Sequence, residues 1–144
     1  MKKNKVITAD EAIALIREND VVTTTGFVQS CIPEALHAAL EKRFVETGSP
    51  RGLTLIMTAG AGDSKGLGTG RLHHDGLLSR VIAANFGRMP KVAQAAQNNQ
   101  IRGYNLPQGV IAANPTSTAD NLHARRVQTQ TRVLARTLQG LVLL

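Results

Sequence analysis

The hydrophobic positions of the chain follow helical spacing first and strand spacing directly after it. Three apolar residues share one side of a helix that begins near residue 9: Ala12, Leu15 and Ile16. Thr8 and Glu11 have the spacing of a capping box, which fixes where this helix begins. The β-branched run at residues 21–25 is typical of a strand. The chain therefore opens with a helix followed by a strand.

The same alternation continues to about residue 111. Apolar runs of strand length occur at residues 53–58, 81–84 and 101–104. Helical segments separate them: one that begins at Pro33, a short one over residues 74–78, and one that begins at Pro90. Alternating helices and apolar strands predict an α/β fold, with an open, mostly parallel sheet and flanking helices. Ligands of such sheets bind outside the carboxyl ends of the strands, so the residues that follow each strand are the candidates for chemistry.

The composition changes after residue 111. Residues 112–144 carry four arginines and one acidic residue, and they contain no aromatic residue. We therefore expect an α/β domain at 5–111 and an atypical tail at 112–144, irregular or weakly helical. The abrupt change motivates the hypothesis that the tail is read out of frame.

Length and composition limit the class of protein. A chain of 144 residues with 42% hydrophobic residues suffices for one domain with a real core. We expect no membrane span, because no apolar run approaches the required length. One cysteine, Cys31, excludes an internal disulfide framework, and no secretory signal follows Met1, so a cytoplasmic protein is expected.

The net charge of +7 invites a nucleic-acid hypothesis, but the basic residues are spread along the chain. Aromatic residues make up 3% of the chain, which leaves few stacking platforms for single-stranded nucleic acid. Anionic small molecules, or a solvated surface alone, are favoured over nucleic acid as explanations of the charge.

A glycine-rich loop follows the second predicted strand. Gly60 and Gly62 begin like a dinucleotide fingerprint, but Lys65 stands where a third glycine belongs, and no Walker loop is present. Such a loop allows close backbone approach to an anion, with Lys65 and Arg71 adding charge. A flexible loop without special function is an equal alternative.

Two further features indicate little chemistry. Cys31 precedes a helix, where a thiolate can be stabilised, but most lone cysteines are inert. His73 and His74 are adjacent, and adjacent residues on a helix point apart. No structural-zinc spacing is present either, so we expect no metal site.

The segment after the fourth predicted strand, residues 105–109, is the most specific. Pro107 fixes the backbone before Gln108, and Gly109 frees it afterwards. Such a turn can present one amide side chain into a crevice. Taken by itself, a plain strand-to-helix turn is the favoured alternative.

Together these segments resemble the N-terminal half of the class I coenzyme A-transferases, most of all the single-chain enzymes for short-chain acyl-CoA (acetate, propionate or acetoacetate). The resemblance is carried by six stretches in family order: residues 26–36, 41–44, 47–51, 59–63, 74–77 and 104–110.

The resemblance implies a reaction in which a glutamate of the C-terminal half attacks an acyl-CoA thioester and then carries CoA to a second carboxylate. It implies that Gln108 supplies an amide close to the reacting carbonyl. It also implies that six residues shape the site: Gly26, Phe27, Gly60, Gly62, Asn105 and Gly109. Acyl-CoA and a short-chain carboxylate are then substrates, no cofactor is permanently bound, and intact relatives form homo-oligomers.

Some residues depart from the family pattern. Gln29 and Cys31 stand where small glycines are usual, and Asn85 stands where near relatives have histidine. Glu34 matches the first signature of the family and not its nucleophile. We therefore expect the chain alone to be inactive. Two alternatives are a non-catalytic module that binds CoA or another anion through residues 60–70, and a basic protein that contacts nucleic acid.

Overall fold

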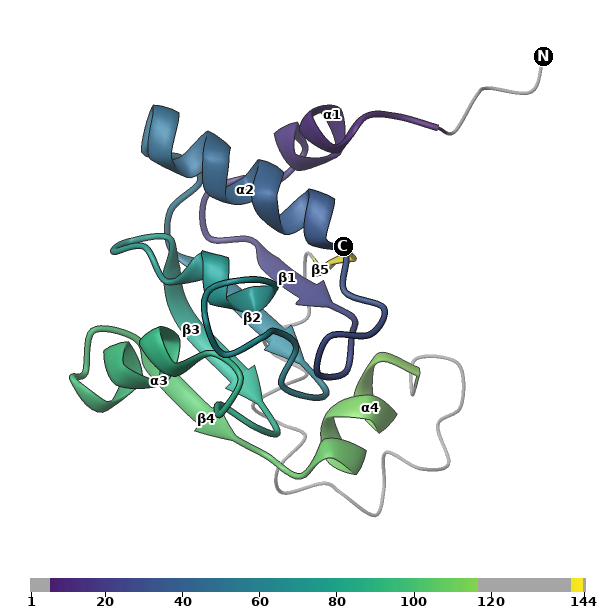
Figure 1. Cartoon of the computed structure of the whole chain (residues 1–144), viewed down its shortest axis with the longest axis vertical. Helices are drawn as coiled ribbons and strands as arrows, with labels where there is room; N and C mark the ends of the chain where they lie inside the picture. Colours follow the sequence, from purple (N-terminus) through teal and green to yellow (C-terminus); the bar gives the residue numbers. More distant parts are fainter. Residues whose placement is uncertain (1–5, 117–140, 144) are drawn as a thin grey trace.

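The computed structural model describes residues 6–116 and 141–143 of the chain. They form a five-stranded parallel sheet in the order β4-β3-β2-β1-β5 (Figure 1). The strands are β1 (Val21–Thr24), β2 (Leu53–Met57), β3 (Leu78–Ala83), β4 (Arg102–Asn105) and β5 (Leu141–Leu143). The helices are α1 (Ala9–Ala14), α2 (Glu34–Thr47), the 3₁₀ helix η1 (Thr69–Leu72), α3 (Pro90–Gln97) and α4 (Gln108–Thr116). The predicted α/β class is confirmed.

The first four helical elements cover one face of the sheet. Ile13 of α1, Leu40 of α2, Leu72 of η1 and Val92 of α3 belong to one buried cluster, together with alternate residues of the central strands such as Leu55. Each of these side chains is almost fully removed from water. Burial of this face supplies most of the apolar stabilisation of the described domain.

α1 begins where the sequence predicts, but the residues that it buries differ from the predicted ones. Thr8 accepts a hydrogen bond from the backbone of Glu11, and the Glu11 carboxylate accepts one from the backbone of Thr8, which completes the capping box. The expected apolar face is partly wrong, because Leu15 is exposed, while Ile13 and Ile16 are buried. The buried side of this turn is the one shared by Ile13 and Ile16, three residues apart, and Leu15, the C-cap of α1, lies outside it.

The prediction of a short helix at residues 74–78 is wrong. The helical turn lies earlier, as η1, and β3 begins at Leu78 and not at residue 81. Gly76 has a left-handed φ of 85°, which no helix continues, and Leu78 is already paired with Leu53 of β2.

The opposite face of the sheet carries a smaller cluster. Ile111 of α4 packs there against Val21, Ile56 and Ile82, one residue from each of three strands. α4 begins at Gln108 and lies at the carboxyl edge of the sheet, beyond the ends of the strands (Figure 1).

The tail contains one element that was not expected. β5 lies parallel to β1, with Val21 opposite Leu141 and Thr23 opposite Leu143, where an irregular or weakly helical tail was predicted. An apolar run with a central β-branched valine is well suited to an edge strand, and it covers the otherwise free edge of β1. Most other residues of the predicted tail lie outside the described ones. None of the described helices is long and apolar enough to span a bilayer.

Candidate functional site

The loops after β1 and β2 are joined by backbone hydrogen bonds at the carboxyl edge of the sheet. The amide of Val28 donates to the carbonyl of Gly60 at 3.1 Å, and the amide of Gly62 donates to the carbonyl of Val28 at 2.6 Å. Val28 holds a positive φ of 57°, which is uncommon for a β-branched residue and points to a functional loop. The residues that the sequence placed after separate strands therefore form one surface.

Gly26 and Gly62 are glycines because the two loops approach so closely. A Cβ on Gly26, whose φ is 122°, would lie 3.0 Å from Cγ1 of Ile32 and 3.2 Å from Cβ of Ala61. A Cβ on Gly62 would lie 2.8 Å from the carbonyl oxygen of Leu67. Both positions exclude a side chain, so glycine is needed there for the close packing of the loops.

The loop after β3 joins the same surface through Gly60. A Cβ on Gly60 would lie 3.2 Å from the side chain of Arg88 and 3.2 Å from the carbonyl oxygen of Asn85. Asn85 accepts a hydrogen bond from the amide of Gly87 at 2.6 Å, so its side chain is used to shape its own loop. Three successive strand-end loops thus contact one another in order.

Asp63 organises the glycine-rich loop, and sequence reasoning did not single it out. Its Oδ1 accepts hydrogen bonds from the amides of Lys65, Gly66 and Leu67 at 2.8–2.9 Å. The amides of Leu67 and Lys65 stabilise the carboxylate most and hold the pKa of Asp63 below its usual value. The Asp63 carboxylate therefore orders this loop. An aspartate or asparagine at the start of a glycine-rich turn is the sequence feature that predicts such an arrangement.

Glu34 and Arg71 tie the far end of this loop to α2. Glu34 accepts a hydrogen bond from the amide of Gly68 at 2.8 Å and one from Nε of Arg71 at 2.6 Å. Arg71 also donates to Glu41 at 2.6 Å, and both carboxylates raise the pKa of the guanidinium. The expectation that Arg71 adds charge for an anion is wrong, because its guanidinium is committed to two ion pairs.

The fourth strand-end segment carries Gln108. The amide of Leu106 donates to the carbonyl of Ala83 at 3.1 Å, which anchors the turn after β4 to the end of β3. Gln108 is exposed and begins α4, while Asn105, at the end of β4, is exposed and paired with Ala83. Gly109 has no atom within 4 Å of an added Cβ, so the structure leaves open space beside Gln108.

Gly26 and Gln108 lie at the same edge of the sheet, since each follows the carboxyl end of a parallel strand (Figure 1). The loop between β1 and α2 also contains Phe27, whose exposed fraction is 64%. Cys31 of the same loop is an exposed free thiol with a φ of 55°. The seven site residues expected from the sequence are all at this edge. The described contacts join the first three loops, whereas the Gln108 segment is anchored through the end of β3.

His37 lies beneath this surface and is fully buried. Its Nε2 is 2.8 Å from Oγ1 of Thr24, the last residue of β1. Burial disfavours the charged ring and lowers the pKa of His37 to about 4. A buried, neutral histidine bonded to a strand-end hydroxyl supports the loop that follows β1 and is removed from solvent.

A second group of side chains gathers between α2 and the turn after η1. Glu41, His73 and His74 each offer one ligand atom, and these atoms lie within 4.8 Å of one another. Partial burial opposes ionisation of Glu41, but hydrogen bonds from His74 and Arg71 outweigh it and lower its pKa. The expectation that the two histidines point apart is wrong, because they lie in a turn and their rings stack at 4.5 Å.

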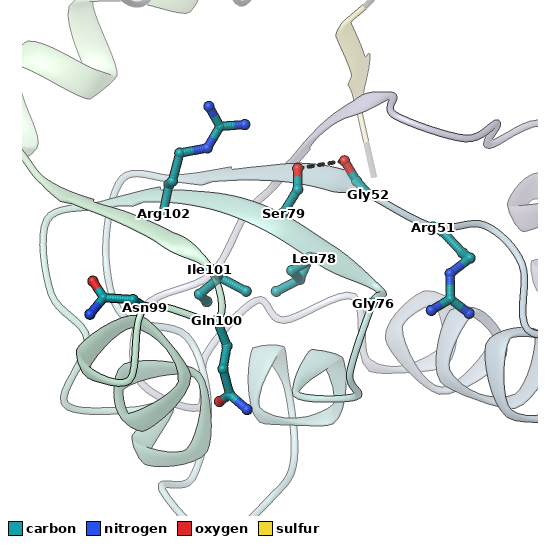
Figure 2. Close-up of a pocket in the computed structure, with 9 residues that line it drawn as sticks. All are labelled: Arg51, Gly52, Gly76, Leu78, Ser79, Asn99, Gln100, Ile101 and Arg102. Atoms are coloured by element: carbon teal, nitrogen blue, oxygen red, sulfur yellow. Dashed lines mark hydrogen bonds between the residues drawn. The ribbon is translucent and has the colours of Figure 1, made fainter.

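A groove of about 550 Å³ lies at the opposite, amino edge of the strands (Figure 2). It is bordered by the starts of β2, β3 and β4, and Ser79 donates there to the carbonyl of Gly52 at 2.7 Å. Figure 2 shows that Arg51 and Arg102 extend away from one another, so their guanidinium groups do not converge on one ligand. The groove is therefore separate from the strand-end surface.

An open parallel α/β sheet whose carboxyl-edge loops are fastened together is the architecture of a ligand-binding or catalytic domain. The sequence model described as Coenzyme A transferase matches residues 6–115. The chain belongs to the coenzyme A transferase family.

Individual relatives agree. The chain is 30% identical over 107 residues to the acetate CoA-transferase YdiF of Escherichia coli K12 and 33% identical over 107 residues to the caffeate CoA-transferase of Acetobacterium woodii. Each match covers 74% of this chain and 20% of the relative. Its fold matches a crystal structure of the acyl-CoA transferase YdiF of Escherichia coli O157:H7, in a thioester complex with CoA, with a TM-score of 0.74 and 28% identity. That match covers 77% of this chain and 22% of the other. The chain thus spans about a fifth of the length of these relatives.

Proposed function

We propose that this chain provides the N-terminal portion of a CoA-transferase that moves coenzyme A between a short-chain acyl-CoA and a free carboxylic acid such as acetate. The observation that carries the proposal is the exposed amide of Gln108 at the same sheet edge as the fastened loops of Gly26 and Gly62. Family membership and the similarity to acetate CoA-transferases support the substrate class.

The proposed chemistry is a ping-pong exchange. A glutamate carboxylate attacks the thioester carbonyl, the C–S bond breaks, and CoA leaves as a thiolate with formation of an acyl-glutamyl anhydride. The thiolate then attacks the glutamyl carbonyl and releases the acid, which leaves a glutamyl-CoA thioester for a second carboxylate. Negative charge develops on the attacked carbonyl oxygen, and the side-chain N–H of Gln108 is suited to donate to it.

The nucleophile in this proposal comes from outside the matched segment. The carboxylates near the described surface are already committed: Asp63 to three loop amides, and Glu34 to Gly68 and Arg71. A carboxylate whose oxygens are already engaged by such donors is not free to attack a thioester carbonyl. We therefore propose that a complementary portion, such as the remainder of a family chain, is required for turnover.

The domain limits belong to the same proposal. The limit expected at residue 111 falls inside α4, and the family match continues to residue 115. We propose an α/β domain that begins near residue 5 and runs through α4, with β5 of the tail added at the β1 edge of its sheet, and a tail that is read out of frame. DNA sequencing tests this directly: family-like sequence in a shifted frame near codon 112 is expected, and its absence would end the frame hypothesis.

The functional test is to assay the purified chain with acetyl-CoA and propionate, with calorimetry of acetyl-CoA in parallel. No turnover is expected from the chain alone. Turnover that disappears in Gln108→Ala but not in Gln100→Ala, an exposed glutamine at the opposite edge, would contradict the need for a complementary portion.

Calorimetry distinguishes the transferase function from the alternative function, which is a non-catalytic module that binds CoA or another anion. The fastened glycine-rich loop, with Lys65 exposed at its tip, is the feature that favours it. Saturable binding that is lost in Lys65→Ala and unchanged in Gln108→Ala would support the module and count against the acyl-site role of Gln108. Gel filtration of the same samples tests the self-association expected from intact relatives.

A further inference from the structure

The side chains of Glu41, His73 and His74 form a cluster that the proposed transferase function does not use. Glu41 comes from the middle of α2, and the two histidines come from the turn between η1 and β3. The cluster lies away from the residues that follow the strand ends. We propose that it binds a divalent transition metal ion, with Zn²⁺ as the best-suited ion, and thereby fastens this turn to α2.

His73 is already oriented as a ligand. Its Nδ1 is 2.9 Å from the carbonyl oxygen of Gly70, and its Nε2 is 3.2 Å from Nζ of Lys91. A carbonyl only accepts and an ammonium only donates, so the proton of the ring is on Nδ1 and the lone pair is on Nε2. A backbone carbonyl that fixes the tautomer and presents the other nitrogen is the usual outer-shell support of a metal-bound histidine.

Glu41 is oriented in the same way. Arg71 holds Oε2 at 2.6 Å, while Oε1 faces Nε2 of His74 at 2.9 Å. One oxygen is thus fixed by an outer guanidinium, and the other faces the histidines. Binding of the ion to Nε2 of His74 replaces the proton now donated to Glu41, and that proton moves to Nδ1 of the same ring or to water.

The ligand atoms are already close, but the two histidine rings, which now stack at 4.5 Å, must turn so that both lone pairs point at one ion. Ligand atoms around a tetrahedral zinc ion lie about 3.3 Å apart, given bonds of roughly 2.0–2.1 Å. The present ligand atoms are all within 4.8 Å of one another, and the closest pair, on Glu41 and His74, would open slightly. Both histidines border a cavity of about 30 Å³ and are only half-buried, so their rings can turn on the solvent side.

The one cation beside the cluster that must leave is the ammonium of Lys91. Lys91 is exposed at the start of α3, and its side chain can rotate into solvent. A solvent molecule would complete the coordination, since the side chains of Glu41 and His74 are 22% and 28% exposed. The proposal therefore predicts competition between Lys91 and the metal ion.

The experiment is titration of the full chain with ZnCl₂ by calorimetry, with CoCl₂ as a spectroscopic probe. One Zn²⁺ per chain is expected, and bound Co²⁺ should give visible absorption. MgCl₂ should not compete, because Mg²⁺ prefers oxygen ligands. Binding must persist in a Cys31→Ser/His123→Gln double variant, which removes the exposed thiol and the one histidine of the sequence that lies outside the described residues.

Variants of the cluster decide the result. His73→Ala and Glu41→Gln should each weaken Zn²⁺ binding by at least about tenfold, whereas Lys91→Ala should strengthen it several-fold. Asp75→Asn is the matched control, since Asp75 is exposed beside His74, and it should change affinity by less than about twofold. Absence of one-to-one binding in the folded wild-type chain overturns the proposal, as does binding that is indifferent to both His73→Ala and Lys91→Ala.

Discussion

The strand-end loops and the cluster between α2 and η1 are held together by different kinds of contact. The loops are fastened mainly through backbone groups, as in the pairing of Val28 with Gly60 and Gly62, and they depend on residues without side chains. The cluster is fastened through charged and ionisable side chains, with Glu41 between Arg71 and His74. A backbone-held surface is sensitive to added volume, whereas a side-chain cluster is sensitive to charge and pH.

The largest expected effect comes from adding volume to the loops. Gly62→Ala places a methyl group 2.8 Å from the carbonyl oxygen of Leu67 and 3.0 Å from that of Arg88, at a φ of 154°. Backbone strain and overpacking together should lower the free energy of unfolding by about 3 kcal/mol, measured by urea denaturation.

The control for this change is Gly70→Ala in η1. An added Cβ at Gly70 meets no atom within 4 Å. The free energy of unfolding of the Gly70→Ala variant should therefore be unchanged or raised by up to about 1 kcal/mol. Equal destabilisation in both variants would show that close approach of the loops is not what requires glycine at position 62.

The next largest expected effect is a pH dependence of the free energy of unfolding, caused by His37. The pKa of His37 is about 4 in the folded chain and about 6.5 when unfolded, so the folded state binds fewer protons. Stability from this group is complete above pH 6.5 and is lost as the pH falls toward 4. Between pH 7 and pH 5 the loss should be about 2 kcal/mol.

Urea denaturation of the wild-type chain and of His37→Gln at both pH values isolates this contribution. Three carboxylates of the described residues have a lowered pKa, Glu11, Glu41 and Asp63; the stability that they contribute is lost at lower pH, and they are present in both proteins. The wild-type chain should lose stability between pH 7 and pH 5, and His37→Gln should lose much less. Parallel curves for the two proteins would contradict a buried neutral His37.

The smallest expected effect is local. Asp63→Ala removes the acceptor of three loop amides, so the amides of Lys65, Gly66 and Leu67 should exchange with solvent about tenfold faster or more. Asp63→Asn keeps one oxygen acceptor and should show an intermediate rate. Native-state hydrogen exchange measures both, and unchanged protection in Asp63→Ala would mean that another contact orders the loop.

The difference between the backbone-held loops and the side-chain cluster also explains what the sequence alone could predict. Helix and strand spacing predicted the parallel sheet, and Gly60 and Gly62 predicted a loop whose backbone can be approached closely. Such features are local, because one segment contains the whole signal. Residues 105–109 form the plain strand-to-helix turn that the sequence favoured, with Gln108 as the first residue of α4 and Gly109 within the helix.

Contacts between distant segments could not be predicted in this way. Arg71 was expected to be free for an anion, and it pairs with two carboxylates of a helix some 30 residues earlier. The convergence of His73 and His74 depends on a turn that local spacing presented as a helix. β5 also escaped prediction, because its partner β1 is more than 100 residues away. Long-range pairing has no signature within a single segment.

The central claim is that Gln108 faces the acyl group at the strand-end surface, and a chimera tests it most directly. Residues 6–112 would replace the matching segment of the Escherichia coli acetate CoA-transferase, and CoA transfer from acetyl-CoA would be measured. Gln108→Ala should lower kcat about 100-fold in this chimera, as expected for loss of a donor to the developing oxyanion, whereas Gln100→Ala should change it less than twofold. Equal kcat for the chimera and its Gln108→Ala variant would contradict the account.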